Sequence, residues 1–349
     1  AIIKTGFLFP INLDFILISC NIPNPMLILL TSSSSLCILM LCILCGNDDF
    51  KLISKRLRNN ISKKVISCTS CSLTFIKNFD VNLIDYDKNY REKYSSVLGK
   101  VMNAEEFYDF SKDIFSNRIK RIKSLLRPSH NILEIGCSTG HFLDLIREQV
   151  STCTGIELDK KYAKFAREKL NLNIYDKPIE KIKFRKKFDT IFLFQVLEHI
   201  PNPIEFLKSC KKILKKNGRI YIEVPNLDDA LYSVYQNSKF KEFYFRAPHL
   251  YYYNKKTLSM LMKKGGFVGQ CNTIQEYSVF NHIHWIQTGM PQKDTKYGYS
   301  SLTWNMDNAK LFKQSKILKK WFDKINCDYK KILEQNDLAE HVSFLGKNT

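Results

Sequence analysis

The sequence is poor in acidic residues, with 34 Asp and Glu against 54 Lys and Arg and a net charge of +20. Such an excess of basic residues is typical of proteins that bind nucleic acid or another anion. A compositional cause is also open, because the dispersed lysines accompany abundant Asn, Ile, Phe and Tyr, as an AT-rich coding sequence would give. The net charge alone therefore does not show whether the protein binds nucleic acid, another anion or neither.

The chain also lacks a G-x-G-x-x-G loop at its most distinctive strand–turn–helix stretch, which excludes the usual dinucleotide site there. Residues 131–146 read NILEIGCSTGHFLDLI: an apolar run ends at Gly136, and apolar residues of helical period follow Gly140. Glu134 ends the predicted strand and would repel a pyrophosphate. The pattern favours a ligand that carries a positive charge and an amino group.

A second predicted strand, within residues 152–159 (TCTGIELD), also ends in acidic residues. Glu157 follows Gly136 by 21 positions, where a carboxylate can accept hydrogen bonds from both hydroxyls of a ribose. Asp159 is predicted to cap the helix that comes next. A nucleoside ligand is therefore expected beside the turn that follows Glu134.

The third to fifth strands of the predicted sheet are found in residues 172–175, 188–200 and 216–226. The run Ile191–Phe194 is continuously apolar, which predicts a strand buried on both faces of a parallel sheet. Gln195, Glu198 and His199 follow it directly, at the carboxyl end of the strand, where ligands bind in open α/β sheets.

Together these motifs resemble those of class I S-adenosylmethionine-dependent methyltransferases, over roughly residues 40–347. The resemblance implies an α/β fold: a Rossmann-like seven-stranded sheet with helices on both faces, preceded by a small zinc ribbon. It implies S-adenosyl-L-methionine as cofactor. The implied cofactor-binding residues are Glu134, Gly136, Cys137, Gly140, Glu157, Asp176, Gln195 and Glu198. For the adenine contact, the backbone at Pro178 and Ile179 is the alternative to Asp176.

Residues 246–267 (RAPHLYYYNKKTLSMLMKKGGF) resemble a family segment with a His, aromatic residues and a helix that ends in Gly-Gly-Phe. His249 matches a histidine that sugar C-methyltransferases of the superfamily place in their active site. Ala247 and Pro248 depart from that motif, which disfavours C-methyl transfer. Because an acceptor hydroxyl or amine must lose a proton, His249 is the first candidate base and His199 the second. Packing of His249 among the tyrosines at 251–253 is the structural alternative.

Of the 11 cysteines, four form two C-x-x-C pairs. In so long a chain this pattern favours a metal site over a disulfide framework, and the spacing matches a four-thiolate zinc ribbon. The predicted ligands of a structural Zn2+ are Cys42, Cys45, Cys68 and Cys71. Gly46 suits the left-handed turn after the first pair, whereas Ser72 replaces glycine after the second.

The remaining predictions concern domains and location. We expect an N-terminal extension over residues 1–39, with Met40 as the natural start, and a cytoplasmic protein with no stable membrane insertion. Residues 26–45 are uncharged and long enough to span a bilayer, so a membrane anchor there is the alternative. The predicted parts after the extension are a zinc ribbon (40–78), a helical linker or lid with Tyr86, Tyr90 and Tyr94 (79–127), the cofactor-binding domain (128–285), a helical insertion (286–338) and a closing strand (339–349).

Within these parts, the sequence predicts a helix over residues 104–126, a sixth strand that begins in residues 275–291 and a basic amphipathic helix over residues 308–335. The resemblance implies methyl transfer to a small molecule, a nucleotide- or lipid-linked sugar in glycan or secondary-metabolite biosynthesis. The expected partner is thus a phosphorylated sugar. Two alternatives stay open: a zinc-containing RNA methyltransferase, with nucleic acid as partner, and a non-catalytic protein that binds S-adenosylmethionine.

Overall fold

The computed structural model describes residues 16–18, 26–30, 36–79, 102–292, 298–299 and 312–348. Tyr86, Tyr90 and Tyr94, with most of the predicted linker or lid, lie outside these residues, as do residues 308–311 of the predicted basic helix. Among the described residues, no helix is long and apolar enough to cross a membrane. Within the uncharged run of residues 26–45, Met26–Leu30 (β2) and Leu36–Met40 (β3) are strands, and β2 also pairs with Ile16–Ile18 (β1).

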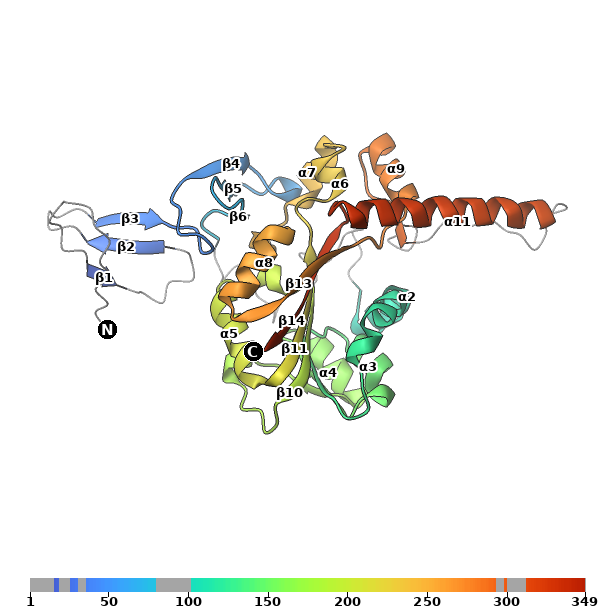
Figure 1. Cartoon of the computed structure of the whole chain (residues 1–349), viewed down its shortest axis with the longest axis horizontal. Helices are drawn as coiled ribbons and strands as arrows, with labels where there is room; N and C mark the ends of the chain where they lie inside the picture. Colours follow the sequence, from blue (N-terminus) through green and yellow to red (C-terminus); the bar gives the residue numbers. More distant parts are fainter. Residues whose placement is uncertain are drawn as a thin grey trace.

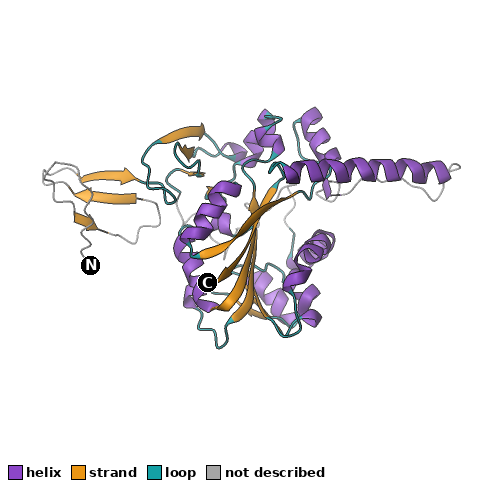
Figure 2. Ribbon diagram, in the orientation of Figure 1, coloured by secondary structure: helices purple, strands orange, loops and turns teal. Residues whose placement is uncertain are grey.

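A seven-stranded mixed sheet with helices on both faces forms the centre of the chain (Figures 1 and 2), as predicted. The strand order is β13-β14-β11-β10-β7-β8-β9, and the strands from β11 to β9 run parallel. Only β14 runs against its neighbours on both sides. The strands are β7 (Asn131–Ile135), β8 (Thr152–Ile156), β9 (Asn173–Tyr175), β10 (Phe188–Phe194), β11 (Leu214–Pro225), β13 (Phe267–Ile274) and β14 (His341–Asn348).

Alternate side chains of β10 build two cores, one on each face of the sheet. Ile191 and Leu193 pack toward α5 (Pro203–Ile213) and α8 (Lys255–Lys264). Phe192 and Phe194 pack on the opposite face, toward the helices listed next. These are α2 (Ala104–Ile122), α3 (His141–Ile146) and α4 (Lys160–Glu168), seen to the right of the sheet in Figure 1. The continuous apolar run is thus explained by burial on both faces.

The predicted helix over residues 104–126 is confirmed as α2 followed by a single 3-10 turn, η3 (Lys123–Leu125). Asn103 and Glu106 form a capping box at its start, which satisfies two backbone N–H groups that the helix leaves open. The other short helices are η1 (Arg58–Asn60), η4 (Arg147–Gln149), η5 (Ile179–Lys181), η6 (Leu197–His199), α6 (Ala230–Ser233) and α7 (Ser238–Tyr244).

The prediction of a sixth strand within residues 275–291 is wrong. The sixth strand is β13, residues 267–274, and Val279–Thr288 forms helix α9, capped by the Ser278 side chain. Strand β13 is an edge strand whose middle residues are exposed, so its sequence carries polar residues and little apolar signal. The predicted basic helix is described as α11 (Phe312–Gln335), and the closing strand predicted at residues 340–347 is confirmed as β14.

The two cysteine pairs belong to a small four-stranded sheet of order β12-β6-β5-β4. Strands β4 (Phe50–Ser54), β5 (Val65–Cys68) and β6 (Thr74–Ile76) form a meander, and β12 (Tyr251–Tyr252) adds to its edge. Because β12 follows His249 directly in the chain, the cysteine-bearing sheet is fixed beside that histidine. The rings of Phe75 and Phe79 pack against Tyr251 at this junction.

Candidate functional site

The turn between β7 and α3 has a backbone that glycine makes possible. The N–H groups of Gly136 and Cys137 both donate to the Ile156 carbonyl of β8, at 2.7 and 3.0 Å. Gly136 and Gly140 have φ angles of 75° and 76°, in the left-handed region. A Cβ on Gly136 would lie 2.4 Å from Cγ2 of Val196, so only glycine fits here.

A cleft of about 800 Å³ opens at the carboxyl ends of β7, β8 and β10. It is lined by six of the residues that the sequence singled out: Glu134, Gly136, Cys137, Glu157, Gln195 and His199. Its lining does not include the other four, which are Gly140, Asp176, Glu198 and His249. Parallel strands open their ligand crevice at this edge, so the cleft lies where a cofactor is expected.

Glu157 is buried and held by two backbone donors. Its Oε2 accepts a hydrogen bond from the Ser138 N–H at 2.7 Å, and its Oε1 accepts one from the Asp159 N–H at 2.8 Å. Each carboxylate oxygen can accept a further hydrogen bond. The two backbone donors therefore fix the position and orientation of this carboxylate in the wall of the cleft. Asp159 caps α4 as predicted, through bonds to the N–H groups of the first turn.

Glu134 lies on the wall of the same cleft, and only 2% of it is exposed. Burial raises its pKa well above the ordinary value, although the nearby Arg118 acts in the opposite direction. Among the described residues, its Oε2 has no hydrogen-bond partner. A buried oxygen of this kind is costly unless a donor reaches it. An amino group of a bound S-adenosylmethionine would satisfy it, so the donor set of the cleft fits this cofactor.

Arg118 and Glu223 form a buried ion pair that sequence reasoning missed, and the more exposed Arg121 joins it. The Nε of Arg118 donates to Glu223 Oε2 at 2.8 Å, and the Nη2 of Arg121 lies 3.4 Å from Glu223 Oε1. The guanidinium of Arg118 also lies 4.3 Å from the ring centroid of Phe194, and it lines the cleft. Burial alone would raise the pKa of Glu223, but the two arginines outweigh it and hold that pKa below the ordinary value.

The adenine contact is the least defined part of the cleft. The carboxylate of Asp176 lies 3.3 Å from the Nη2 of Arg167, outside the cleft lining. Pro178 and Ile179 do line the cleft. Their position favours the alternative in which this backbone, rather than Asp176, borders the adenine. Gly140 supports the turn from behind, where a Cβ would lie 2.6 Å from Cδ1 of Leu172.

Glu198, His199 and His249 meet at one end of the cleft. One ligand atom from each lies within 4.8 Å of the others. His199 is the member that lines the cleft, whereas His249 is buried behind it with ring centroids 4.9 Å apart. Burial raises the pKa of Glu198 to about 8. Burial also lowers the pKa of His249 well below the ordinary value, and the charge of Arg246 adds to that effect.

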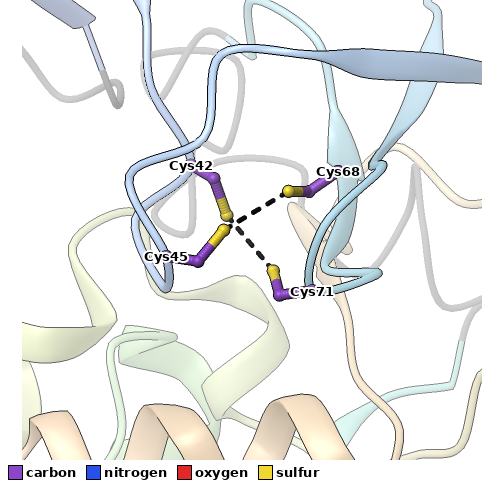
Figure 3. A group of neighbouring side chains, drawn as sticks. All are labelled: Cys42, Cys45, Cys68 and Cys71. Carbon is purple, nitrogen blue, oxygen red and sulfur yellow. Dashed lines mark hydrogen bonds between the residues drawn. The ribbon is translucent and has the colours of Figure 1, made fainter.

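Cys42, Cys45, Cys68 and Cys71 converge, as Figure 3 shows, with all four sulfurs within 4.8 Å of one another. The Sγ–Sγ distances are 3.4 Å for Cys42 and Cys71 and 3.5 Å for Cys45 and Cys68. A tetrahedral Zn2+ with bonds of about 2.3 Å would place its sulfurs about 3.8 Å apart, so the donor set fits zinc.

The two cysteine turns share one backbone pattern, despite the difference between Gly46 and Ser72. The Gly46 N–H donates to the Cys42 carbonyl at 2.8 Å, and the Ser72 N–H donates to the Cys68 carbonyl at 3.0 Å. Their φ angles are 77° and 71°, so Ser72 takes the left-handed conformation that glycine takes in the first turn. The departure from glycine leaves the second turn intact.

Part of this chain is similar in sequence to a described family and to several known proteins. Residues 108–271 match a family described as "Methyltransferase domain". An uncharacterized protein of Methanocaldococcus jannaschii is 27% identical over 168 residues, which cover 47% of this chain and 78% of that protein. A ubiquinone biosynthesis O-methyltransferase of Pelagibacter ubique is 35% identical over 113 residues, 30% of this chain and 47% of that enzyme.

The chain thus spans about half the length of the ubiquinone biosynthesis O-methyltransferases that it matches. Among solved structures, a SAM-dependent methyltransferase of Archaeoglobus fulgidus is 19% identical, with a TM-score of 0.45 over 70% of this chain and 97% of that one. The assignment of the fold rests on the sheet and cleft described above rather than on this overlap.

Proposed function

We propose that this chain is a class I S-adenosylmethionine-dependent methyltransferase that methylates an oxygen of a small, phosphorylated acceptor, a nucleotide- or lipid-linked sugar. The observation that carries the proposal is the cleft at the carboxyl ends of β7, β8 and β10, with two buried acids on its wall. The proposal of an oxygen acceptor is supported by the similarity to enzymes named ubiquinone biosynthesis O-methyltransferases.

The donor end of the cleft is assigned to the residues around the turn after β7. Glu157 would accept hydrogen bonds from the ribose, and Glu134 would accept one from the amino group of the donor. Gly136 and Cys137 would let the donor approach the backbone closely. Bound S-adenosylmethionine would supply an activated methyl group that leaves sulfur as the acceptor attacks in line. The chain itself mainly aligns the two reactants and excludes water.

The acceptor end of the cleft is assigned to the side that His199 lines. Two cationic side chains lie behind this side, near His249: the charges of Arg246 and Arg58 both lower the pKa of that histidine, although neither arginine lines the cleft. Arg58 is itself affected: burial and the charge of Arg246 lower its pKa to about 9. Like charges gathered in this way are typical of a site for a phosphate-bearing molecule. This is the support for a phosphorylated acceptor.

Loss of the acceptor's proton is assigned to the cluster of Glu198, His199 and His249. The Nδ1 of His199 lies 2.7 Å from the Pro248 carbonyl, which can only accept, so His199 donates from Nδ1 and its Nε2 lies 3.9 Å from Glu198 Oε1. The Leu250 N–H donates to the Glu198 carbonyl at 2.8 Å, and this bond ties the same two chain segments together. The cluster is therefore held rigidly at the acceptor end.

The test is calorimetry with S-adenosylmethionine, followed by assays of methyl transfer to nucleotide sugars, lipid-linked sugars, catechols and RNA. We expect donor binding and transfer of label to an oxygen of a phosphorylated sugar. Glu157→Gln should weaken donor binding by roughly 10–100-fold, whereas Glu205→Gln, a change at an exposed rim residue, should leave it unchanged. Donor binding without turnover on any acceptor would favour a non-catalytic protein, and turnover on RNA alone would contradict the sugar.

We also propose that Cys42, Cys45, Cys68 and Cys71 hold a structural Zn2+. Four thiolates around one ion would complete its tetrahedral coordination and leave no open position. The apolar residues of β5 and β6 are buried in the same hydrophobic cluster as the central sheet, and zinc binding would add to the folding free energy that this packing supplies. Native mass spectrometry of the full chain should show one tightly held zinc, and Cys45→Ser should lose it. A zinc-free wild-type chain with the same thermal stability would contradict the proposal.

A further inference from the structure

Helix α11 carries large apolar side chains that are exposed to water. Ile317, Leu318, Trp321 and Ile332 are 60%, 55%, 56% and 56% exposed. Trp321 follows Leu318 and Ile317 by three and four positions and precedes Ile332 by 11, which is about three turns, so all four lie on one face of the helix. Exposed apolar residues are ordinary when they are scattered singly, whereas a row of them indicates an interaction surface. These four residues form the apolar stripe of α11.

The apolar stripe is not what holds α11 to the rest of the chain. Leu333 is buried in a small cluster with Ala230 and Ala339, and the Oδ1 of Asn326 accepts a hydrogen bond from the Val279 N–H of α9 at 3.0 Å. These contacts come from the second half of the helix. Its first half extends away from the central sheet (Figure 1). The fold of the described residues therefore leaves the apolar stripe open to a partner.

A row of lysines lies beside the apolar stripe. Helix α11 contains seven lysines and only three acidic residues. Lys313, Lys320, Lys324 and Lys331 recur at intervals of 7, 4 and 7 positions, so they share one side of the helix. This side borders the stripe, because Lys324 follows Trp321 by three positions. An apolar face with lysines next to it is typical of helices that lie on the surface of an anionic membrane.

The charges distinguish this partner from two others. Contact between the α11 helices of two copies would bring two lysine rows together, and like charges repel. Nucleic acid would pair with the lysines but would leave the apolar stripe in water. An anionic lipid surface satisfies both sets of side chains, since its headgroups attract lysines and its acyl boundary takes up apolar groups. Trp321 suits such a boundary, because its indole has an apolar body and a polar N–H.

We infer that α11 docks the chain on an anionic lipid surface, with the apolar stripe at the acyl boundary and the lysine row on the headgroups. Docking of this kind needs no membrane-spanning helix. The inference goes beyond methyl transfer, and it rests on the proposed function only where it bears on the acceptor. Of the two acceptors proposed there, it favours the lipid-linked sugar, which is held at the same surface.

The experiment is sedimentation of the full chain with vesicles, without donor or acceptor. One set contains phosphatidylglycerol and phosphatidylcholine in equal parts, and the other contains phosphatidylcholine alone. We expect binding to the first set that weakens as the salt concentration rises. Because a net charge of +20 would by itself attract the chain to anionic vesicles, the variants decide.

Trp321→Glu should weaken binding to the anionic vesicles at least about tenfold, since the burial of a large apolar side chain is lost. Lys320→Gln combined with Lys324→Gln should weaken it by roughly 30-fold, from the attraction typical of two lysines near such a surface. Val268→Glu is the matched control: Val268 is 67% exposed on the edge strand β13, and its replacement should leave vesicle binding nearly unchanged. All of these side chains are exposed, and circular dichroism checks the fold of each variant.

Three results would overturn the inference. The first is a wild-type chain that does not bind the anionic vesicles. The second is equal binding by Trp321→Glu, which would assign the attraction to net charge alone. The third is self-association that Trp321→Glu abolishes, in a chain that does not bind vesicles, which would assign the apolar stripe to a second copy.

The docking surface and the proposed function fail in different ways. Vesicle binding that depends on Trp321, without methyl transfer to any lipid-linked sugar, would keep the docking surface and remove that acceptor. Methyl transfer to a soluble nucleotide sugar, by a chain that does not bind vesicles, would keep the methyltransferase and remove the docking surface. Calorimetry with S-adenosylmethionine is run on the same preparations, and Trp321→Glu should bind the donor as the wild type does, because Trp321 does not line the cleft.

Discussion

Replacement of Glu223 by glutamine tests the buried charge network between α2 and β11. The side chain is 1% exposed, and it neutralises Arg118 at 2.8 Å and Arg121 at 3.4 Å. Removal of one partner from a buried pair costs about 3–5 kcal/mol, because the other charge is left uncompensated. Arg121 keeps Glu276 at 2.5 Å, so the loss falls mainly on Arg118. We therefore expect Glu223→Gln to lower the free energy of unfolding by about 3 kcal/mol.

The assay is urea unfolding of the full chain at pH 7, followed by circular dichroism. Glu205→Gln is the control: its partner Lys208 lies 2.7 Å away, but the two side chains are 72% and 50% exposed, so the loss should stay below about 0.5 kcal/mol. Addition of Arg118→Met to Glu223→Gln should recover part of the stability, since it removes the buried charge whose ionic bond to Glu223 is lost. A Glu223→Gln chain within about 1 kcal/mol of wild type would refute the reasoning.

The same network fixes the sign of a pH effect. Arg118 and Arg121 outweigh burial and keep the pKa of Glu223 in the folded chain below its unfolded value of about 4.3. The ionised carboxylate therefore stabilises the fold above that pH, and the contribution is lost as the pH falls through the folded pKa. In Glu223→Gln, the free energy of unfolding should fall less steeply between neutral pH and acid than in the wild type.

Three further predictions concern the cleft and the cysteine site. Glu157→Gln should weaken the binding of S-adenosylmethionine by roughly 10–100-fold in calorimetry, since a hydrogen bond to a charged group contributes about 1.5–3 kcal/mol; unchanged affinity would contradict the ribose role. Gly136→Ala should weaken donor binding at least about tenfold, because a left-handed φ costs about 1–2 kcal/mol in a residue with a Cβ, and this Cβ would meet Val196 at 2.4 Å. Val196→Ala added to Gly136→Ala should restore the part of the donor affinity that the steric clash removes. A strong chelator should release zinc and make residues 40–78 sensitive to protease before the central sheet, as followed by mass spectrometry; equal resistance would argue against a structural metal.

Much of the donor side of the cleft could be predicted because its signals are local. The turn from Gly136 to Gly140 joins a strand directly to a helix, and Glu157 ends the next strand, so spacing alone brings them to one sheet edge. The sixth strand could not be found in the same way. Strand β13 lies at the edge with exposed polar residues, whereas the apolar residues of α9 mimic a strand.

The acceptor side was decided by tertiary structure. His249 was ranked first as a base from its segment, yet His199 is the one that lines the cleft, because β12 draws the segment after His249 toward the cysteine-bearing sheet. Asp176, a candidate from its place after a strand, lies 3.3 Å from Arg167 and outside the lining of the cleft. Neither position could be predicted from the spacing of these residues in the sequence.

The sequence by itself determined the parallel strands of the sheet, the turn after β7 and the four-cysteine cluster, because each depends on short spacings and on side chains that one or two adjacent elements carry. Only the tertiary structure decided that Arg118 reaches Glu223 across 105 positions and that Glu198 and His199 meet His249. The physical reason is that such contacts arise where α2 packs on the sheet and where η6 meets the segment before β12. The partner of a buried charge depends on which side chains the tertiary fold brings close to it, and local sequence patterns do not predict that partner.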